Sequence, residues 1–122
     1  MTGYSIGEIS HLTGLTIDTL RYYERIELLV DIRRNQSGHR CYSDDDLGWL
    51  NLLVCLRETG MSIADMTRFA VLIRQGEESV PDRVTLLSKH RQDVLNKIAQ
   101  MEQKLEGVEA KINHYLEQEK NK

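Results

Sequence analysis

The last third of the chain carries an apolar repeat that strongly restricts its structure. From residue 84 to residue 115, apolar side chains recur at alternating spacings of three and four, interrupted at Arg91. This heptad pattern predicts a coiled coil. A helix over residues 81–119 would span roughly 58 Å at ~1.5 Å per residue, too long to bury its stripe against a small head domain. We therefore expect dimerisation through Leu87, Val94, Ile98, Met101, Leu105, Val108 and Ile112.

The residues before this repeat divide into short elements with clear start and stop signals. Ser5 and the glutamate three residues later predict a capping box for a helix over residues 6–13. Gly14 suits the left-handed end of that helix. Thr16 then caps a second helix through about residue 27. Two short helices joined by a glycine-containing turn predict a helix-turn-helix.

A basic hairpin and two further helices are expected after the second helix. Residues 28–42 pass from an apolar run into a polar segment with a turn near residues 35–38, which predicts a short hairpin, or wing. Ser43 caps a helix over residues 44–59 that is apolar nearly all round, so we expect it to be central and buried. Ser62 starts a fourth helix. We expect a head domain at residues 1–76 and a coiled-coil dimerisation helix with its tail at residues 77–122.

The second helix contains the string that points to a function. Arg21 and Tyr22 stand in the sequence Leu-Arg-Tyr-Tyr-Glu-Arg, an unusual composition for a core helix. Arginine binds phosphate or guanine with a fork of donors, and tyrosine reaches phosphate oxygens. The net charge of -3 argues against a broadly basic surface. Residues 16–42 nevertheless hold five arginines against four acidic residues. Any affinity for nucleic acid must therefore come from a few placed arginines.

Composition limits the class of protein to which the chain can belong. With 122 residues, 40% of them hydrophobic, the chain is expected to form one compact domain with an extended appendage. The sequence has no long apolar run and no basic segment followed by an apolar stretch, so neither a membrane span nor a signal peptide is expected. Two cysteines without a metal-binding spacing favour free thiols in the cytoplasm. Nothing predicts an enzyme, a cofactor or a metal site.

The order of elements and several strings resemble the MerR family of bacterial transcription regulators. The matching strings are Tyr4–Ile9, Thr19–Glu24, Gly38–Tyr42 and Gly60–Ile63. The resemblance implies a mainly α fold, with a winged helix-turn-helix head and an antiparallel coiled-coil dimer. It implies a homodimer that binds double-stranded promoter DNA and bends and underwinds it, so that RNA polymerase is affected indirectly through the promoter.

The same resemblance implies specific contact residues. Arg21 and Tyr22 would hold the DNA backbone, with Thr16 and Thr19 at the exposed start of the second helix. Arg33, Arg34, His39 and Arg40 would be wing contacts, while Tyr42 anchors the wing to the head. The amides at Ser62 and Ile63 open a helix and could accept a phosphate.

The signal that such a regulator senses is less determined. Cys55 resembles the lone cysteine of the short aldehyde- and thiol-stress-responsive branch of the family, which predicts a sensor thiol. Cys55 could instead be a small buried hydrophobic residue without a sensing role. The regulator could also respond to a small molecule and not to a thiol modification. Cys41 on the wing is a weaker candidate thiol. A non-sensing architectural protein with the same head is a further alternative.

Overall fold

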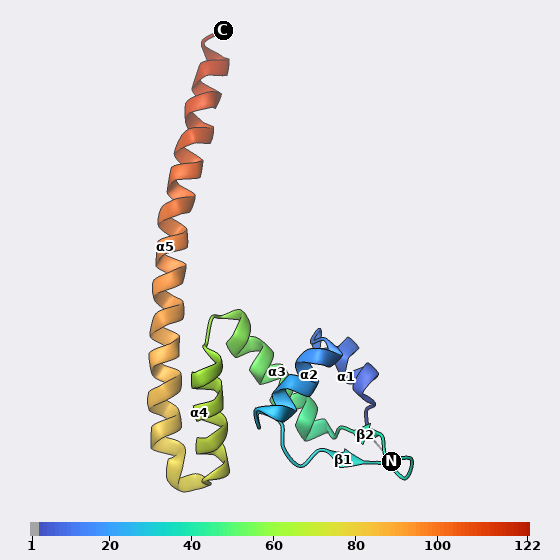
Figure 1. Ribbon diagram of the computed structural model, residues 1–122. Coiled ribbons are helices and arrows are strands. Elements are labelled where there is room, and N and C mark those ends of the chain that lie inside the picture. The colour runs from blue at the N-terminus through green and yellow to red at the C-terminus, as the bar shows by residue number, and fades with distance from the viewer. Residues whose placement is uncertain (1–2) are drawn as a thin grey trace. The chain divides into compact units, whose positions relative to one another are not determined.

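The computed structural model describes residues 3–122 and is mainly helical (Figure 1). Its elements are α1 (Ile6–Thr13), α2 (Ile17–Arg25), β1 (Arg33–Arg34), β2 (Arg40–Cys41), α3 (Asp44–Glu58), α4 (Ile63–Arg74), the 3-10 turn η1 (Glu77–Ser79) and α5 (Val80–Lys120). This order confirms the predicted winged helix-turn-helix head followed by a long C-terminal helix. The expectation of no signal peptide falls partly on residues 1–2, outside the described range.

The chain divides into two compact units after Leu86. We call the unit that ends at Leu86 the head, and the remainder, residues 87–122, the coil segment. The predicted domains, 1–76 and 77–122, stay a prediction about where DNA binding ends and dimerisation begins. Within residues 3–122 no helix combines the length and the apolar character needed to cross a membrane.

Capping side chains and residues with left-handed backbone set the ends of the first two helices. The Ser5 hydroxyl accepts a hydrogen bond from the Glu8 amide at 3.1 Å, and the Glu8 carboxylate accepts one from the Ser5 amide at 3.0 Å. This bond lowers the pKa of the Glu8 carboxyl below its usual value. Gly14 ends α1 with φ 77°. Thr16 caps α2, which stops two residues earlier than expected because Glu27 has left-handed backbone (φ 64°).

Every α-helix of the head buries apolar side chains, and α1 packs on α2 and on α3 (Figure 1). The buried set is Ile9, Leu15, Leu20, Tyr23, Leu28, Leu29, Tyr42, Leu50, Leu53, Leu56, Met61, Met66, Phe69, Ala70, Leu72 and Leu86. Each fully buried aliphatic or aromatic side chain contributes about 1.5–3 kcal/mol. This core fixes the orientation of α2, so the same residues always face outward.

Helix α3 does not have the expected all-round burial. Leu50, Leu53 and Leu56 are buried on one side, whereas Leu52 is 37% exposed and Cys55 is exposed. The expectation of a fully buried helix is therefore wrong for a single chain. Only one side of α3 is covered by other elements of the head, and the composition of a helix does not reveal which side that is.

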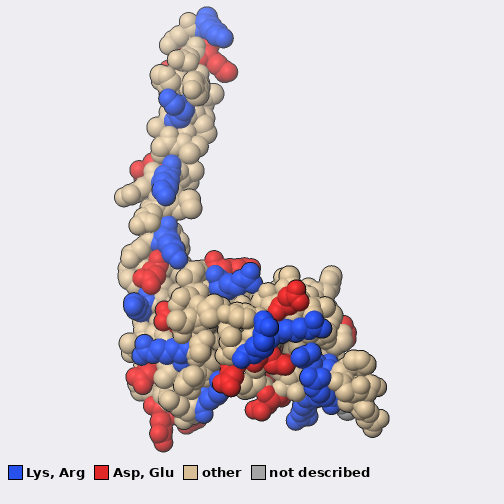
Figure 2. All heavy atoms as spheres, in the orientation of Figure 1, with Lys and Arg blue, Asp and Glu red and all other residues tan. Residues whose placement is uncertain are grey.

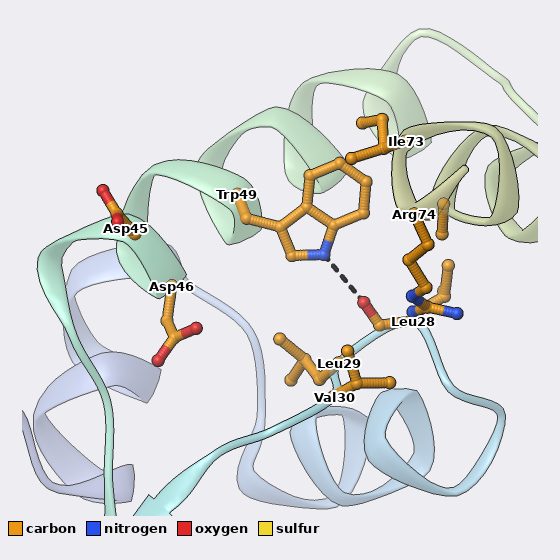
Figure 3. A pocket seen from close by; sticks show the side chains of 9 residues that line it. Leu28, Leu29, Val30, Asp45, Asp46, Trp49, Ile73 and Arg74 are labelled. Carbon is orange, nitrogen blue, oxygen red and sulfur yellow. Dashed lines mark hydrogen bonds between the residues drawn. The ribbon is translucent and has the colours of Figure 1, made fainter. Parts of the chain in front are cut away.

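Trp49 fastens α3 to the segment after α2 (Figure 3). Its indole Nε1 donates a hydrogen bond to the Leu28 carbonyl at 2.7 Å, and its ring stacks on Phe69 at 5.9 Å between centroids. Trp49 is thus a packing residue. It also lines a cavity of about 290 Å³, together with Leu28, Leu29, Val30, Asp45, Asp46, Ala70, Ile73 and Arg74.

The coil segment presents its apolar stripe to solvent. Between 48% and 68% of each of the following side chains is exposed: Leu95, Ile98, Met101, Leu105, Val108, Ile112, Tyr115 and Leu116. Leu87 and Val94 are partly covered. Helix α5 runs unbroken for 41 residues, in agreement with the predicted long helix.

Candidate nucleic-acid interface

Helix α2 has one buried side and one exposed side. Leu20 and Tyr23 face the core. The opposite side carries Asp18, Arg21, Tyr22 and Arg25, all of them exposed. The Arg25 guanidinium lies 5.8 Å from the centre of the Tyr22 ring, which holds these two side chains together. The outward side therefore offers cationic and phenolic donors on a rigid helix.

Arg21 is available for an external partner. Among residues 3–122 Arg21 forms no ion pair, either with Asp18 or with Glu24 on its own helix. Glu24 instead binds Arg40. An exposed guanidinium on a helix surface can donate a fork of hydrogen bonds to phosphate or to guanine.

The threonines at the start of α2 organise its first turn. The Thr16 hydroxyl accepts a hydrogen bond from the Thr19 amide at 3.0 Å and donates one to the Thr19 hydroxyl at 2.9 Å. Thr16 is exposed and Thr19 is half-buried. The first turn is thereby fixed, and Thr16 stays accessible at the end of the helix where backbone N–H groups point outward.

The wing is a short antiparallel hairpin in which Arg33 faces Cys41 and Arg34 faces Arg40. The Asn35 side chain accepts hydrogen bonds from the amides of Ser37 at 2.9 Å and His39 at 3.0 Å, which closes the turn. The Arg34 guanidinium donates to the Gly38 carbonyl at 2.8 Å. Arg33, Arg34 and His39 are all exposed. The wing tip therefore presents cationic donors on a turn of fixed shape.

Arg40 has a partner within the chain. Its guanidinium donates two hydrogen bonds to the Glu24 carboxylate, at 3.0 and 3.2 Å. The bonded carboxylate holds the pKa of Arg40 above its usual value. A two-point bond of this kind fixes orientation as well as distance. Arg40 thus connects the wing to α2, and the DNA contact that the resemblance implies for it would require the guanidinium to leave Glu24.

Tyr42 lies at the base of the wing. Its backbone pairs with that of Tyr4 through two hydrogen bonds of 2.8 Å, and its side chain is 1% exposed. Within residues 3–122 the buried Tyr42 hydroxyl has no hydrogen-bond partner. Burial raises the pKa of this phenol. These contacts agree with the expected role of Tyr42 as an anchor for the wing.

A shallow groove joins α2 to the start of α4. About 270 Å³ in volume, it is lined by Thr19, Tyr22, Tyr23, Arg57, Met61, Ile63 and Met66. The adjacent Ser62 hydroxyl caps α4 by accepting a hydrogen bond from the Asp65 amide at 3.1 Å. A helix N-terminus beside an arginine and a tyrosine is an arrangement that suits one phosphate.

Sequence reasoning did not single out Arg57. The residue lies in the last turn of α3 and is distant in sequence from Tyr22, so only the fold brings the two to one groove. Its position three residues before Gly60 in the turn between α3 and α4 is the only sequence signal that could have indicated it. We expect Arg57 to share a phosphate with Tyr22.

Charge on the head is mixed. Figure 2 shows basic and acidic side chains interspersed over the face in view, without one broad basic surface. This distribution matches the net charge of -3. A nucleic-acid contact on this surface would depend on the geometry of single arginines.

The sequence and the fold are similar to those of known regulators. The family model described as the MerR HTH family regulatory protein matches residues 4–70. An uncharacterised HTH-type transcriptional regulator of Haemophilus influenzae is 34% identical over 112 residues, which cover 92% of this chain and 83% of that protein. The chain belongs to the MerR family. It is a DNA-binding transcriptional regulator and not an enzyme.

Two solved MerR family structures support the same assignment. A family regulator from Listeria monocytogenes superposes with a TM-score of 0.85 at 38% identity, over 92% of this chain and 85% of the other. HiNmlR, a MerR family regulator lacking the sensor domain, was crystallised bound to promoter DNA. It matches with a TM-score of 0.81 at 33% identity, over 86% of this chain and 80% of that one.

Proposed function

We propose that the protein acts in the cytoplasm as a homodimer that binds promoter DNA with both heads, and that it bends and underwinds the DNA between them. RNA polymerase would respond indirectly, through the altered promoter. The observation that carries this proposal is the exposed apolar stripe of the coil segment, at heptad spacing. Apolar side chains left in water at a coiled-coil period favour pairing with a second helix.

Residue roles follow from the geometry of the head. Arg21, Tyr22 and the first turn of α2 would dock against the DNA, and Arg33, Arg34 and His39 would contact phosphates from the wing. The groove beside Ser62 supports a further phosphate contact, because Tyr22, Arg57 and Ile63 line it together. Two heads on one DNA molecule can impose a deformation whose energetic cost depends on the spacer sequence.

The dimer is tested by sedimentation of the wild type and of a Leu105→Glu variant. The wild type is expected to sediment as a dimer at micromolar concentration, because burial of a leucine in the seam contributes about 1.5–3 kcal/mol. The variant places a charge in the seam of both subunits and should dissociate. A Lys104→Glu variant adds the same side chain next to the seam and should remain dimeric. A wild type that stays monomeric would rule out the homodimer.

Cys55 is our candidate for the sensor thiol. A sensor thiol has to be accessible to its reagent, and Cys55 is exposed and not a buried hydrophobic residue. Cys41 is less accessible, because its sulfur packs closely against Gly3. Modification of Cys55 by an aldehyde or another electrophile would alter α3, which connects the docking surface to α4.

The sensing role is tested by induction of a reporter gene from the protein's own promoter. Formaldehyde should induce the reporter with the wild type and with a Cys41→Ser variant, but not with Cys55→Ser, while all three bind the promoter equally. Normal induction with Cys55→Ser would exclude the sensor role and leave the DNA-binding function intact.

A second candidate, response to a small molecule, is favoured by one observation. The cavity beside Trp49 is apolar on most sides and lies between α3, α4 and the segment after α2 (Figure 3). Trp49 is the only tryptophan of the chain, so its fluorescence reports on this cavity alone. Quenching by an inducing compound, with induction retained in Cys55→Ser, would favour this candidate over the thiol.

A further inference from the structure

Asp18 and Arg25 are the residues of α2 that point most directly away from the core, and one of them is an acid. At about 100° per residue, Leu20 and Tyr23 lie about 160° and 140° around the helix from Asp18. Both of those side chains are buried, whereas Asp18 is exposed. Its neighbours on the outward side are Tyr22 and Arg25. Asp18 therefore lies in the first turn of α2, on the surface that we propose docks on DNA.

This carboxylate has no cation to neutralise it. Among residues 3–122, Asp18 forms no ion pair, although Arg21 lies three residues further along the same helix. The other carboxylate of α2, Glu24, is bound to Arg40. An unpaired negative charge opposite a polyanion weakens binding to every DNA sequence equally. An acid on this surface therefore either stabilises the start of α2 or contacts a group other than phosphate.

The major groove offers a suitable contact. In a helix-turn-helix, the N-terminal residues of the second helix reach the base edges. Cytosine presents its N4 amino group there as a donor, and aspartate accepts a hydrogen bond from that group. Guanine and thymine present acceptors at the corresponding edge, which a carboxylate repels. A carboxylate at this point thus disfavours guanine and thymine. It favours cytosine over adenine, because the N6 amino group of adenine lies beside the N7 acceptor, which repels the carboxylate.

We propose that Asp18 is a specificity-determining residue that reads the N4 amino group of a cytosine in each half of the operator. This inference rests on the proposed docking of α2 in the major groove. Asp18 could instead have a purely structural role, in which its negative charge stabilises α2 by interacting with the positive end of the helix dipole. That role predicts a change in stability but no change in sequence preference.

The first experiment selects duplexes from a randomised pool with the full-length protein. The wild type should enrich a cytosine at one position in each half-site. Asp18→Ala should lose the preference at that position only. Asp18→Asn should shift it towards adenine, because an amide pairs with adenine N6 and N7. Asp45→Ala is the matched control, since Asp45 occupies the same position in the first turn of α3.

The second experiment removes only the atom that Asp18 is proposed to contact. In the selected duplex, that cytosine is replaced by 2-pyrimidinone, which lacks the N4 amino group. Wild-type affinity should fall roughly 5- to 100-fold, the discrimination expected of a good base contact, while Asp18→Ala should bind both duplexes equally.

The outcomes separate this inference from the proposed function. If Asp18→Ala enriches the same sequence as the wild type, or gains affinity equally for all duplexes, Asp18 reads no base and the inference is overturned. If the wild type enriches no sequence, the proposed docking itself fails.

Discussion

The buried hydroxyl of Tyr42, at the base of the wing, allows a test of how side chains pack in the head. Tyr42 is 1% exposed, and its hydroxyl has no partner within the described residues. Burying an unpaired hydroxyl costs about 1–3 kcal/mol, and the aromatic ring packs equally well without it. We predict that Tyr42→Phe keeps or raises the free energy of unfolding at neutral pH, by up to about 1 kcal/mol, measured by urea denaturation. A loss above this amount would mean that the hydroxyl has a partner.

The same side chain predicts a pH dependence. Burial raises the pKa of Tyr42 above its ordinary value of about 10. Below that pH the phenol is neutral in both states and no stability is lost. Above it the unfolded chain releases the proton first, so the free energy of unfolding falls as pH rises. Tyr42→Phe should therefore lose less stability than the wild type between neutral pH and pH of about 11.

Arg33 and Arg40 of the wing should differ in their contributions to DNA binding and to stability. Arg33 is free at the surface, so Arg33→Ala should lower the slope of log affinity against log salt by about 2 per dimer. Arg40 is bound to Glu24, so Arg40→Ala should leave that slope nearly unchanged and lower the free energy of unfolding by about 1 kcal/mol. Glu24→Gln should reproduce the stability loss. Equal slopes for Arg33→Ala and Arg40→Ala would show that Arg40 leaves Glu24 for phosphate.

At the scale of elements, two glycines should respond to alanine in opposite directions. Gly14 ends α1 with φ 77°, and an added Cβ meets nothing within 4 Å, so backbone strain alone sets the cost, about 1 kcal/mol. Gly48 lies within α3 with equally open surroundings, and alanine there should stabilise by about 0.5–1 kcal/mol. Urea denaturation measures both. Stabilisation by Gly14→Ala would contradict the left-handed turn.

The elements themselves could be predicted because their signals are local. The caps at Ser5 and Thr16 and the glycine turn at Gly14 depend on side chains within a few residues of one another. The burial of α3 could not be predicted in the same way. Leu52 and Leu53 are equally apolar, and only the packing of other helices decides that one is exposed and the other buried.

The docking surface was predictable only in part. Arg21 and Tyr22 share one short string, so sequence alone could suggest them. The groove that Tyr22 shares with Arg57 and Ile63 joins three helices, and the pair of Arg40 with Glu24 joins residues 16 apart. Contacts of this kind arise from tertiary structure and leave no spacing pattern in the sequence.

At the scale of the whole molecule, we propose that affinity for DNA comes from dimerisation. The chain has a net charge of -3 and a mixed surface, so general attraction to DNA is weak. A dimer doubles each arginine contact and holds the two heads on one DNA molecule, which raises affinity without any new contact. The proposed function therefore depends most on the outward side of α2. Without the Arg21 side chain, the dimer should still form but should bind DNA poorly.

The most direct test is equilibrium binding of the wild type and Arg21→Ala to a duplex from the protein's own upstream region. We predict that Arg21→Ala remains a folded dimer, binds at least about 10-fold more weakly, and lowers the salt slope by about 2 per dimer. Lys104→Ala, which removes a positive charge from the coil segment, should bind as the wild type does. Unchanged affinity and salt slope in a folded Arg21→Ala dimer would contradict the docking of α2 on DNA.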